Sequence, residues 1–167
     1  MSQLRIAVVS ANAAGLYAAD LLMRCAMPIA VDIFDQAPAP VGLTPNAVHA
    51  NTNQANTEQT TQSSVRVIGN VTIGADGDLS LESLKPFYDA VIVADFASEA
   101  QAHGAVAAAV GIAKSKAKHA LSDITHALGT HGVAFTEWRD ALSLPTDRTL
   151  AQWQEVVRVA RGVPVCV

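Results

Sequence analysis

The sequence of 167 residues predicts an α/β fold of three layers, in which helices cover both faces of a doubly wound, mostly parallel β-sheet. Two runs of apolar, largely β-branched residues, 4–9 and 29–34, are typical of strands that are buried on both faces. A helix is expected between them, over 16–25, because apolar residues recur there on one helical face. A third run of the same kind, 88–94, predicts another buried strand.

The remaining elements follow from local signals. Residues 65–74 are strand-like, and a turn follows at 76–78. Ser80 is the expected cap of a short helix over 80–85. A longer helix is expected over 113–128, with Gly129 as its end. Two amphipathic segments come next, each with one tryptophan, and the closing residues have the composition of an edge strand; these three segments are 136–142, 149–161 and 163–167.

Composition and charge exclude several classes of protein. A net charge of -4 and a pI near 5.6 argue against a general nucleic-acid binder, which would carry a basic face. The first residues do not show the charged-then-apolar pattern of a signal peptide. The longest weakly polar run, 104–113, is too short to span a bilayer. We therefore expect a soluble, cytoplasmic, single-domain protein with no nucleic-acid partner and no membrane insertion.

The turn after the first strand has the frame of a dinucleotide-binding turn but only part of its chemistry. Such a turn uses three glycines, and here Ser10 and Asn12 replace the first two while Gly15 keeps the third. The Asn12 side chain would lie where a pyrophosphate sits, and it could instead bond the amides at the helix N-terminus. Asp35 follows Gly15 by twenty residues, the spacing of an acid that binds an adenosine ribose. Both outcomes, a nucleotide site and a closed turn, are compatible with this pattern.

No pattern in the sequence points to hydrolytic, nucleophilic or metal chemistry. The five histidines include no His-x-x-x-His pair with an intervening Glu. Cys25 and Cys166 lie far apart, without metal or redox spacing, as expected for free thiols in a reducing compartment. No Gly-x-Ser-x-Gly motif is present. We therefore predict no catalytic residues and no metal site.

Several segments taken together resemble one known family, the adrenodoxin-reductase-type ferredoxin–NADP reductases. Order and spacing are similar to the FAD domain of that family from residue 4 to about 97, and the match is looser near the C-terminus, around 110–117, the two tryptophans and 162–165. The segments that carry the N-terminal resemblance are 6–9, 14–22, 31–35, 38–43, 69–74, 78–81 and 88–94.

The resemblance implies a domain organisation and a set of FAD contacts. The family inserts an NADPH domain into its FAD domain, whereas this chain passes directly from an N-terminal part, 1–97, to a return segment, 104–167. A polar segment, 49–64, is expected to be a mobile loop. If FAD were retained, the resemblance implies contacts from Ser10, Asn12, Gly15, Asp35, Gly42, Leu43 and Gly111.

The departures from the family pattern fall at positions where backbone would approach the flavin. The family's Gly-x-Gly-Pro-Ala-Gly is replaced by Ser10–Gly15, and its Ala-Thr-Gly by Ala94-Asp95-Phe96. Its Gly-Val-Ala-Pro-Asp-His is replaced by 47–52, its Gly-Pro-x-Gly by 105–108 and its Arg-Pro-Arg by 163–165. Because the strand and helix cores are kept, we interpret the pattern as a fold retained without its cofactor, with Phe96 filling part of the vacated space.

These observations predict a non-catalytic relative of the reductase FAD domain. It would act as an accessory, assembly or regulatory subunit, in a larger complex or a homo-oligomer, and would hold no cofactor. The alternative is a small electron-transfer flavoprotein that binds FAD and takes electrons from a partner; a weaker one is a sensor of a different nucleotide. Candidate docking surfaces are the 49–64 loop, the lysine-bearing helix at 114–118 and the tryptophan-bearing C-terminal segments.

Overall fold

A computed structural model describes residues 4–25, 27–37, 64–116, 124–139 and 147–160. Five strands form one sheet in the order β4-β1-β2-β3-β5. Four of them are parallel neighbours, and β5 pairs antiparallel with β3 at one edge. The expected class, a mostly parallel, Rossmann-like α/β sheet, is confirmed. The strands are β1 (Leu4–Val9), β2 (Ile29–Phe34), β3 (Ser64–Gly69), β4 (Ala90–Val93) and β5 (Thr136–Arg139).

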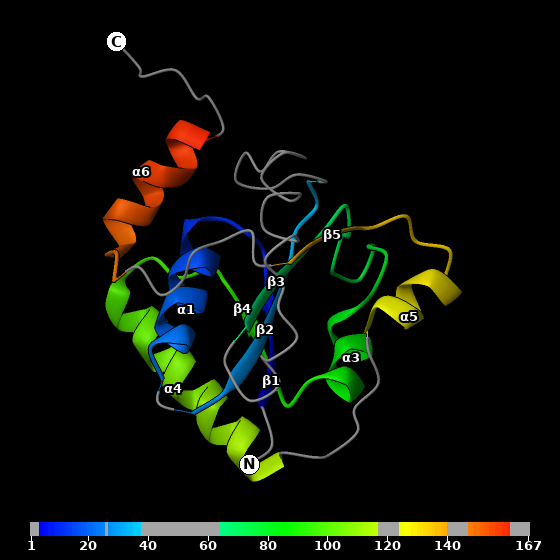
Figure 1. Ribbon diagram of the computed structural model, residues 1–167, viewed down its shortest axis with the longest axis horizontal. Coiled ribbons are helices and arrows are strands. Elements are labelled where there is room, and N and C mark those ends of the chain that lie inside the picture. Colours follow the sequence, from blue (N-terminus) through cyan, green and yellow to red (C-terminus); the bar gives the residue numbers. More distant parts are fainter. Residues whose placement is uncertain (1–3, 26, 38–63, 117–123, 140–146, 161–167) are drawn as a thin grey trace.

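Helices cover both faces of the sheet and give the three expected layers (Figure 1). On one face α1 and α4 pack on the sheet and α6 packs on α1, whereas α3, the short 3-10 helix η2 and α5 lie on the other. Each face has its own cluster of buried apolar side chains, because successive strand residues point to opposite faces. The bounds are α1 (Ala13–Met23), α3 (Leu81–Leu84), η2 (Lys85–Phe87), α4 (Glu99–Lys116), α5 (Ile124–Thr130) and α6 (Leu150–Ala160).

The largest error in the sequence prediction concerns the helix expected over 113–128. The structure instead begins α4 at Glu99 and ends it at Lys116, and it forms α5 separately. Gly129 lies inside α5, and Gly132, with φ of 74°, comes after its end. The sequence signal was weak because the alanine-rich start of α4 shows little contrast between apolar and polar faces, although alanine is the best helix former.

The C-terminal elements depart from the sequence reading in one place. Of the two amphipathic segments, 136–142 forms β5 in its first four residues and 149–161 forms α6. The short helix near 80 is as expected, with the Ser80 hydroxyl accepting from the Ser83 amide at 3.2 Å. Residues 49–63 of the predicted 49–64 loop and the closing 163–167 segment lie outside the described residues, whereas Ser64, the last residue of that predicted loop, begins β3.

A buried polar cluster joins three strands on the face covered by α3 and α5. Asp32 of β2 and Arg66 of β3 are register partners, and Arg66 donates from Nε and Nη2 to the Asp32 carboxylate at 2.9 and 2.6 Å. The Tyr88 hydroxyl donates to the same carboxylate at 2.5 Å. Arg66 Nη1 reaches Glu137 of β5 at 3.0 Å. The cluster therefore fixes the β2–β3 register and ties the edge strand β5 to the sheet.

The first prediction concerns this buried pair. Arg66→Met leaves the Asp32 charge buried with less compensation, so urea unfolding should show a loss of about 3–5 kcal/mol in the free energy of unfolding. The matched control is Lys85→Met, which removes an exposed pair with Glu82 and should cost less than about 1 kcal/mol. Equal losses for the two variants would contradict the proposed importance of the buried pair.

The second prediction concerns alkaline pH. Burial raises the pKa of Tyr88 well above its ordinary 10.0, helped by the Asp32 carboxylate. Burial also raises the pKa of Tyr17, the other tyrosine. The unfolded chain therefore loses tyrosine protons first, and the free energy of unfolding falls above pH 10, by up to about 1.4 kcal/mol per pH unit for each tyrosine. Urea unfolding across this pH range should show a smaller decline for Tyr88→Phe; an unchanged decline would contradict the prediction.

Candidate functional site

The candidate site lies at the carboxyl ends of β1 and β4. Within the sheet, β1 has β2 as its neighbour on one side and β4 as its neighbour on the other. The chain therefore adds strands first on one side of β1 and later on its other side. In open α/β sheets such a reversal of strand order is where ligands bind. The turn from Ser10 to Asn12 follows β1, and Ala94 to Phe96 follow β4, so these two loops lie at this end of the sheet.

The Asn12 side chain caps α1 and connects the turn after β1 to the end of β4. Its Oδ1 accepts from the Gly15 amide at 2.8 Å, and its Nδ2 donates to the Ala94 carbonyl at 3.2 Å. Its φ of -76° and ψ of -179° are extended, as expected of a helix N-cap. One carboxamide therefore bonds an amide of the first helical turn and also joins the ends of β1 and β4. This matches the sequence-based possibility that Asn12 bonds the amides at the helix N-terminus.

Ser10 has a backbone conformation that favours glycine. Its φ is 93°, in a region that favours glycine and is uncommon for other residues. Its amide donates to the Phe34 carbonyl at 2.6 Å, and its hydroxyl lies 3.4 Å from the Asn12 amide. The turn therefore bends as tightly as a glycine-rich turn, and its bend is held by bonds to β2 and within the loop.

Gly15 is required by the close approach of α1 to the end of β1. A Cβ at this position would lie 1.9 Å from the Ser10 carbonyl oxygen, which is far inside van der Waals contact. The nearest side-chain atom would be the Ala94 Cβ at 3.5 Å. The third glycine of the dinucleotide pattern thus keeps its packing role between helix and strand.

Asp35 lies at the end of β2, as expected, and its carboxylate is engaged by the backbone. Oδ1 accepts from the Ala11 amide at 2.9 Å, and Oδ2 accepts from the Ala37 amide at 3.1 Å. The carboxylate therefore fastens the turn after β1 to the turn after β2. Asp35, predicted as a ribose contact, joins these two turns through its hydrogen bonds.

The predicted cofactor-contacting residues are only partly brought together. Ser10, Asn12, Gly15 and Asp35 lie within one bonded network at the carboxyl edge of the sheet. Gly111, expected at the start of a helix, lies deep inside α4 instead, beside a groove between α1 and α4. Phe96 packs partly buried against the main apolar cluster. Gly42 and Leu43 lie outside the described residues.

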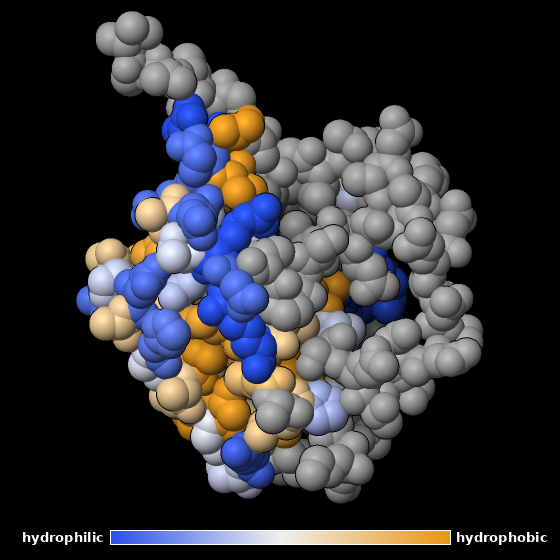
Figure 2. Space-filling view, turned by 60° about the vertical axis from the view of Figure 1, so that its left-hand side comes forward, coloured by the Kyte–Doolittle hydropathy of each residue, from blue (hydrophilic) through white to orange (hydrophobic). Residues whose placement is uncertain are grey.

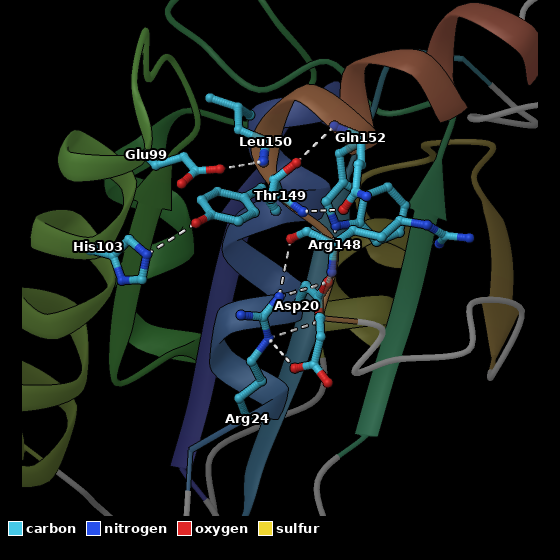
Figure 3. Close-up of polar contacts among 11 residues, drawn as sticks. Asp20, Arg24, Glu99, His103, Arg148, Thr149, Leu150 and Gln152 are labelled. Atoms are coloured by element: carbon cyan, nitrogen blue, oxygen red, sulfur yellow. Dashed lines mark hydrogen bonds and ion pairs between the residues drawn. The ribbon is translucent and has the colours of Figure 1, made fainter.

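Sequence reasoning missed a second polar network, centred on Asp20 of α1 (Figure 3). Asp20 is fully buried, and its Oδ2 accepts from Trp153 Nε1 at 3.0 Å and from the Arg148 amide at 3.3 Å. Arg24, one turn further along α1, forms an ion pair with Asp20 at 3.2 Å. The available signal was a carboxylate on an otherwise apolar helix, which demands buried partners.

The same network holds the start of α6 (Figure 3). The Arg148 guanidinium stacks 5.0 Å from the centre of the Trp153 ring, and Glu99 of α4 accepts from the Leu150 amide at 2.8 Å. Both tryptophan rings are buried, with exposures of 2% for Trp153 and 7% for Trp138. The rings therefore anchor α6 and β5 to the core, and the docking role expected of the tryptophan-bearing segments stays a prediction.

Metal-binding groups, buried polar atoms without a partner and membrane-spanning helices were each sought among the described residues. The described His, Cys, Asp and Glu side chains form no group of three that could hold a metal ion. Every buried side-chain nitrogen and oxygen among the described residues has a hydrogen-bond partner. No described helix combines the length and apolar character needed to cross a bilayer.

Comparisons with known proteins returned no relative: neither a protein-family model nor a curated protein matches this sequence. The resemblance to the reductase FAD domain therefore stays a prediction from the sequence.

The third prediction tests the packing role of Gly15. Gly15→Ala should lower the free energy of unfolding by about 2–3 kcal/mol or more, because the Ser10 carbonyl must move to admit a methyl group. Gly129→Ala is the matched control, since nothing lies within 4 Å of a Cβ there, and its stability should be unchanged or higher. Thermal unfolding of both variants makes the comparison, and a tolerated Gly15→Ala would contradict the close approach.

Proposed function

We propose that this protein is a non-catalytic α/β domain related to the FAD domain of ferredoxin–NADP reductases and that it acts through protein contacts. It would be an accessory, assembly or regulatory subunit that holds no flavin. The observation that carries the proposal is that the Asn12 side chain makes two hydrogen bonds. Its Oδ1 accepts from the Gly15 amide, and its Nδ2 donates to the Ala94 carbonyl. The proposal combines this geometry with the family resemblance seen in the sequence.

The Asn12 side chain and a pyrophosphate would compete for the same backbone amide at the start of α1, and this supports the absence of a pyrophosphate. A phosphate at such a turn binds through N–H groups at the helix N-terminus. Here the Gly15 amide already donates to Asn12, and the Ala11 amide donates to Asp35. A pyrophosphate would have to displace the Asn12 side chain, and the helix would lose a cap whose replacement by Ala typically costs about 1 kcal/mol. The residues present therefore do not fit a pyrophosphate in this arrangement.

Asp35, the residue expected at a ribose, has a structural role that needs no nucleotide. The carboxylate of Asp35 accepts from two backbone amides, one in the turn after β1 and one in the turn after β2. A ribose hydroxyl would add a further hydrogen bond to the Asp35 carboxylate, which already joins the two turns. The side chains that a nucleotide needs are thus used to complete the fold.

The alternative, a small flavoprotein that binds FAD, rests on two retained features. Gly15 keeps the helix close to the strand, and Asp35 stays at the end of β2. Rotation of the Asn12 side chain would release the Gly15 amide. This alternative differs from the proposal in a property that can be measured directly.

The fourth prediction is that the protein purifies colourless and does not bind FAD. FAD present at a hundred times its Kd would stabilise the folded chain by about 2.7 kcal/mol, so thermal unfolding with and without FAD is a sensitive test. We expect no shift in Tm and no flavin released on denaturation. A yellow protein with stoichiometric FAD would overturn the proposal and establish the alternative.

A second measurement addresses the protein contacts. A tagged chain should be recovered from its native cells as a colourless component of a larger assembly. A colourless chain that stays monomeric and is recovered alone would remove the protein-contact part of the proposal.

A further inference from the structure

Helix α6 is held to the rest of the protein along one narrow face. Leu150, Trp153 and Val157 are buried and recur at helical spacing on that face. Glu155 and Val159, which point elsewhere, are exposed. Among the described elements, α6 packs extensively on α1 alone. Figure 2 shows the C-terminal half of α6 extending beyond the other described elements at the top of the view. The helix therefore lies on the outside of the α/β core.

The contacts that anchor α6 to α1 and α4 gather at its N-terminal end (Figure 3). The buried Asp20 carboxylate accepts from Trp153 Nε1 at 3.0 Å and from the Arg148 amide at 3.3 Å. Glu99 of α4 accepts from the Leu150 amide at 2.8 Å. These bonds fall within residues 148–153, so the helix is attached most firmly where it begins.

The first turn of α6 satisfies two of its own amides. The Thr149 amide donates to Gln152 Oε1 at 2.8 Å, and the Gln152 amide donates to Thr149 Oγ1 at 3.1 Å. Such a reciprocal pair is a capping box, which stabilises the N-terminus of a helix. Both bonds lie within the segment itself, so these caps do not require contact with α1.

Docking of α6 carries a cost that its release would return. Asp20 is fully buried beneath α6, and the burial of a carboxylate costs free energy that its partners must offset. Without α6, Asp20 and Arg24 would form a solvent-exposed ion pair one helical turn apart on α1. Water would then replace the donors that α6 supplies, and this exchange lowers the net cost of release.

We propose that α6 is a releasable latch, which undocks from α1 as one unit while the five-stranded sheet stays folded, and which thereby controls access to Asp20. In the docked state Asp20 and the α1 surface beneath Trp153 are hidden, and in the released state both face water. Sub-global opening of this kind is expected of an element with few buried apolar contacts. The latch makes no use of the proposed function, so its test and the flavin test can fail separately.

The fifth prediction is that α6 opens by itself, which native-state hydrogen exchange of the full chain in low urea can measure. We expect the hydrogen-bonded amides of α6 to share one protection factor and to exchange roughly a hundredfold or more faster than those of β1. Their dependence on urea should be weaker, because release of one helix exposes less surface than unfolding does. The same protection and urea dependence as β1 would overturn the proposal. So would a steep rise in exchange from Trp153 to Val159, which would indicate fraying from the C-terminal end.

A conservative variant tests the contact with Asp20. Trp153→Phe keeps an aromatic ring but removes the N–H that Asp20 accepts, so exchange of the α6 amides should become about tenfold faster or more. The matched control is Glu155→Gln, in which α6 loses an exposed ion pair with Arg158, and its exchange should change less than about threefold. Equal effects of the two substitutions would overturn the proposal.

A variant in the sheet separates release of α6 from global unfolding. Arg66→Met weakens the buried cluster on the opposite face of the sheet, in the released state as much as in the docked one. It should therefore speed exchange of the β1 amides by about a hundredfold or more and leave exchange of the α6 amides unchanged. An equal acceleration of α6 would show that it opens only with the whole fold and would overturn the proposal.

Discussion

The close approach of α1 to the end of β1 is the constraint on which the other features depend. It places the Gly15 Cα against the Ser10 carbonyl, and it forces Ser10 into a backbone conformation that favours glycine. The tight turn is stabilised by hydrogen bonds of its amides. The Ala11 amide donates to the Asp35 carboxylate, and the Gly15 amide donates to the Asn12 side chain. The turn leads from β1, which pairs with β2 on one side and β4 on the other, into α1.

The partners that complete this turn are also the groups that a dinucleotide would require. A polar backbone that is not occupied by a ligand must be satisfied by protein or water. In this chain a carboxamide and a carboxylate perform that task at the position expected for a pyrophosphate and a ribose. The structure thus offers a physical reason why the fold could persist without a cofactor, which is the central argument for the proposed role as a protein-binding subunit.

Two buried carboxylates organise the remaining layers from opposite faces of the sheet. Asp32 joins β2, β3 and β5 through Arg66, and Asp20 holds the start of α6 through Trp153 and the backbone of Arg148. The internal polar bonds therefore fix where α6 and β5 lie.

The sequence by itself determined the α/β class, strands β1, β2 and β4, helix α1 and the four residues around the turn, because these depend on local apolar runs and on residues close in the chain. Only the tertiary structure decided the rest. The start of α4 lacks a strong periodic signal, so its length follows from packing on β4 and α1. The partners of Asp35, Asp20 and Arg66 lie between 2 and 133 residues away in the chain, and most of them are brought near only by the folded sheet and its helices. Whether a carboxylate binds a ligand or holds two parts of the fold together depends on these contacts. The spacing of residues along the chain does not show which residues make them.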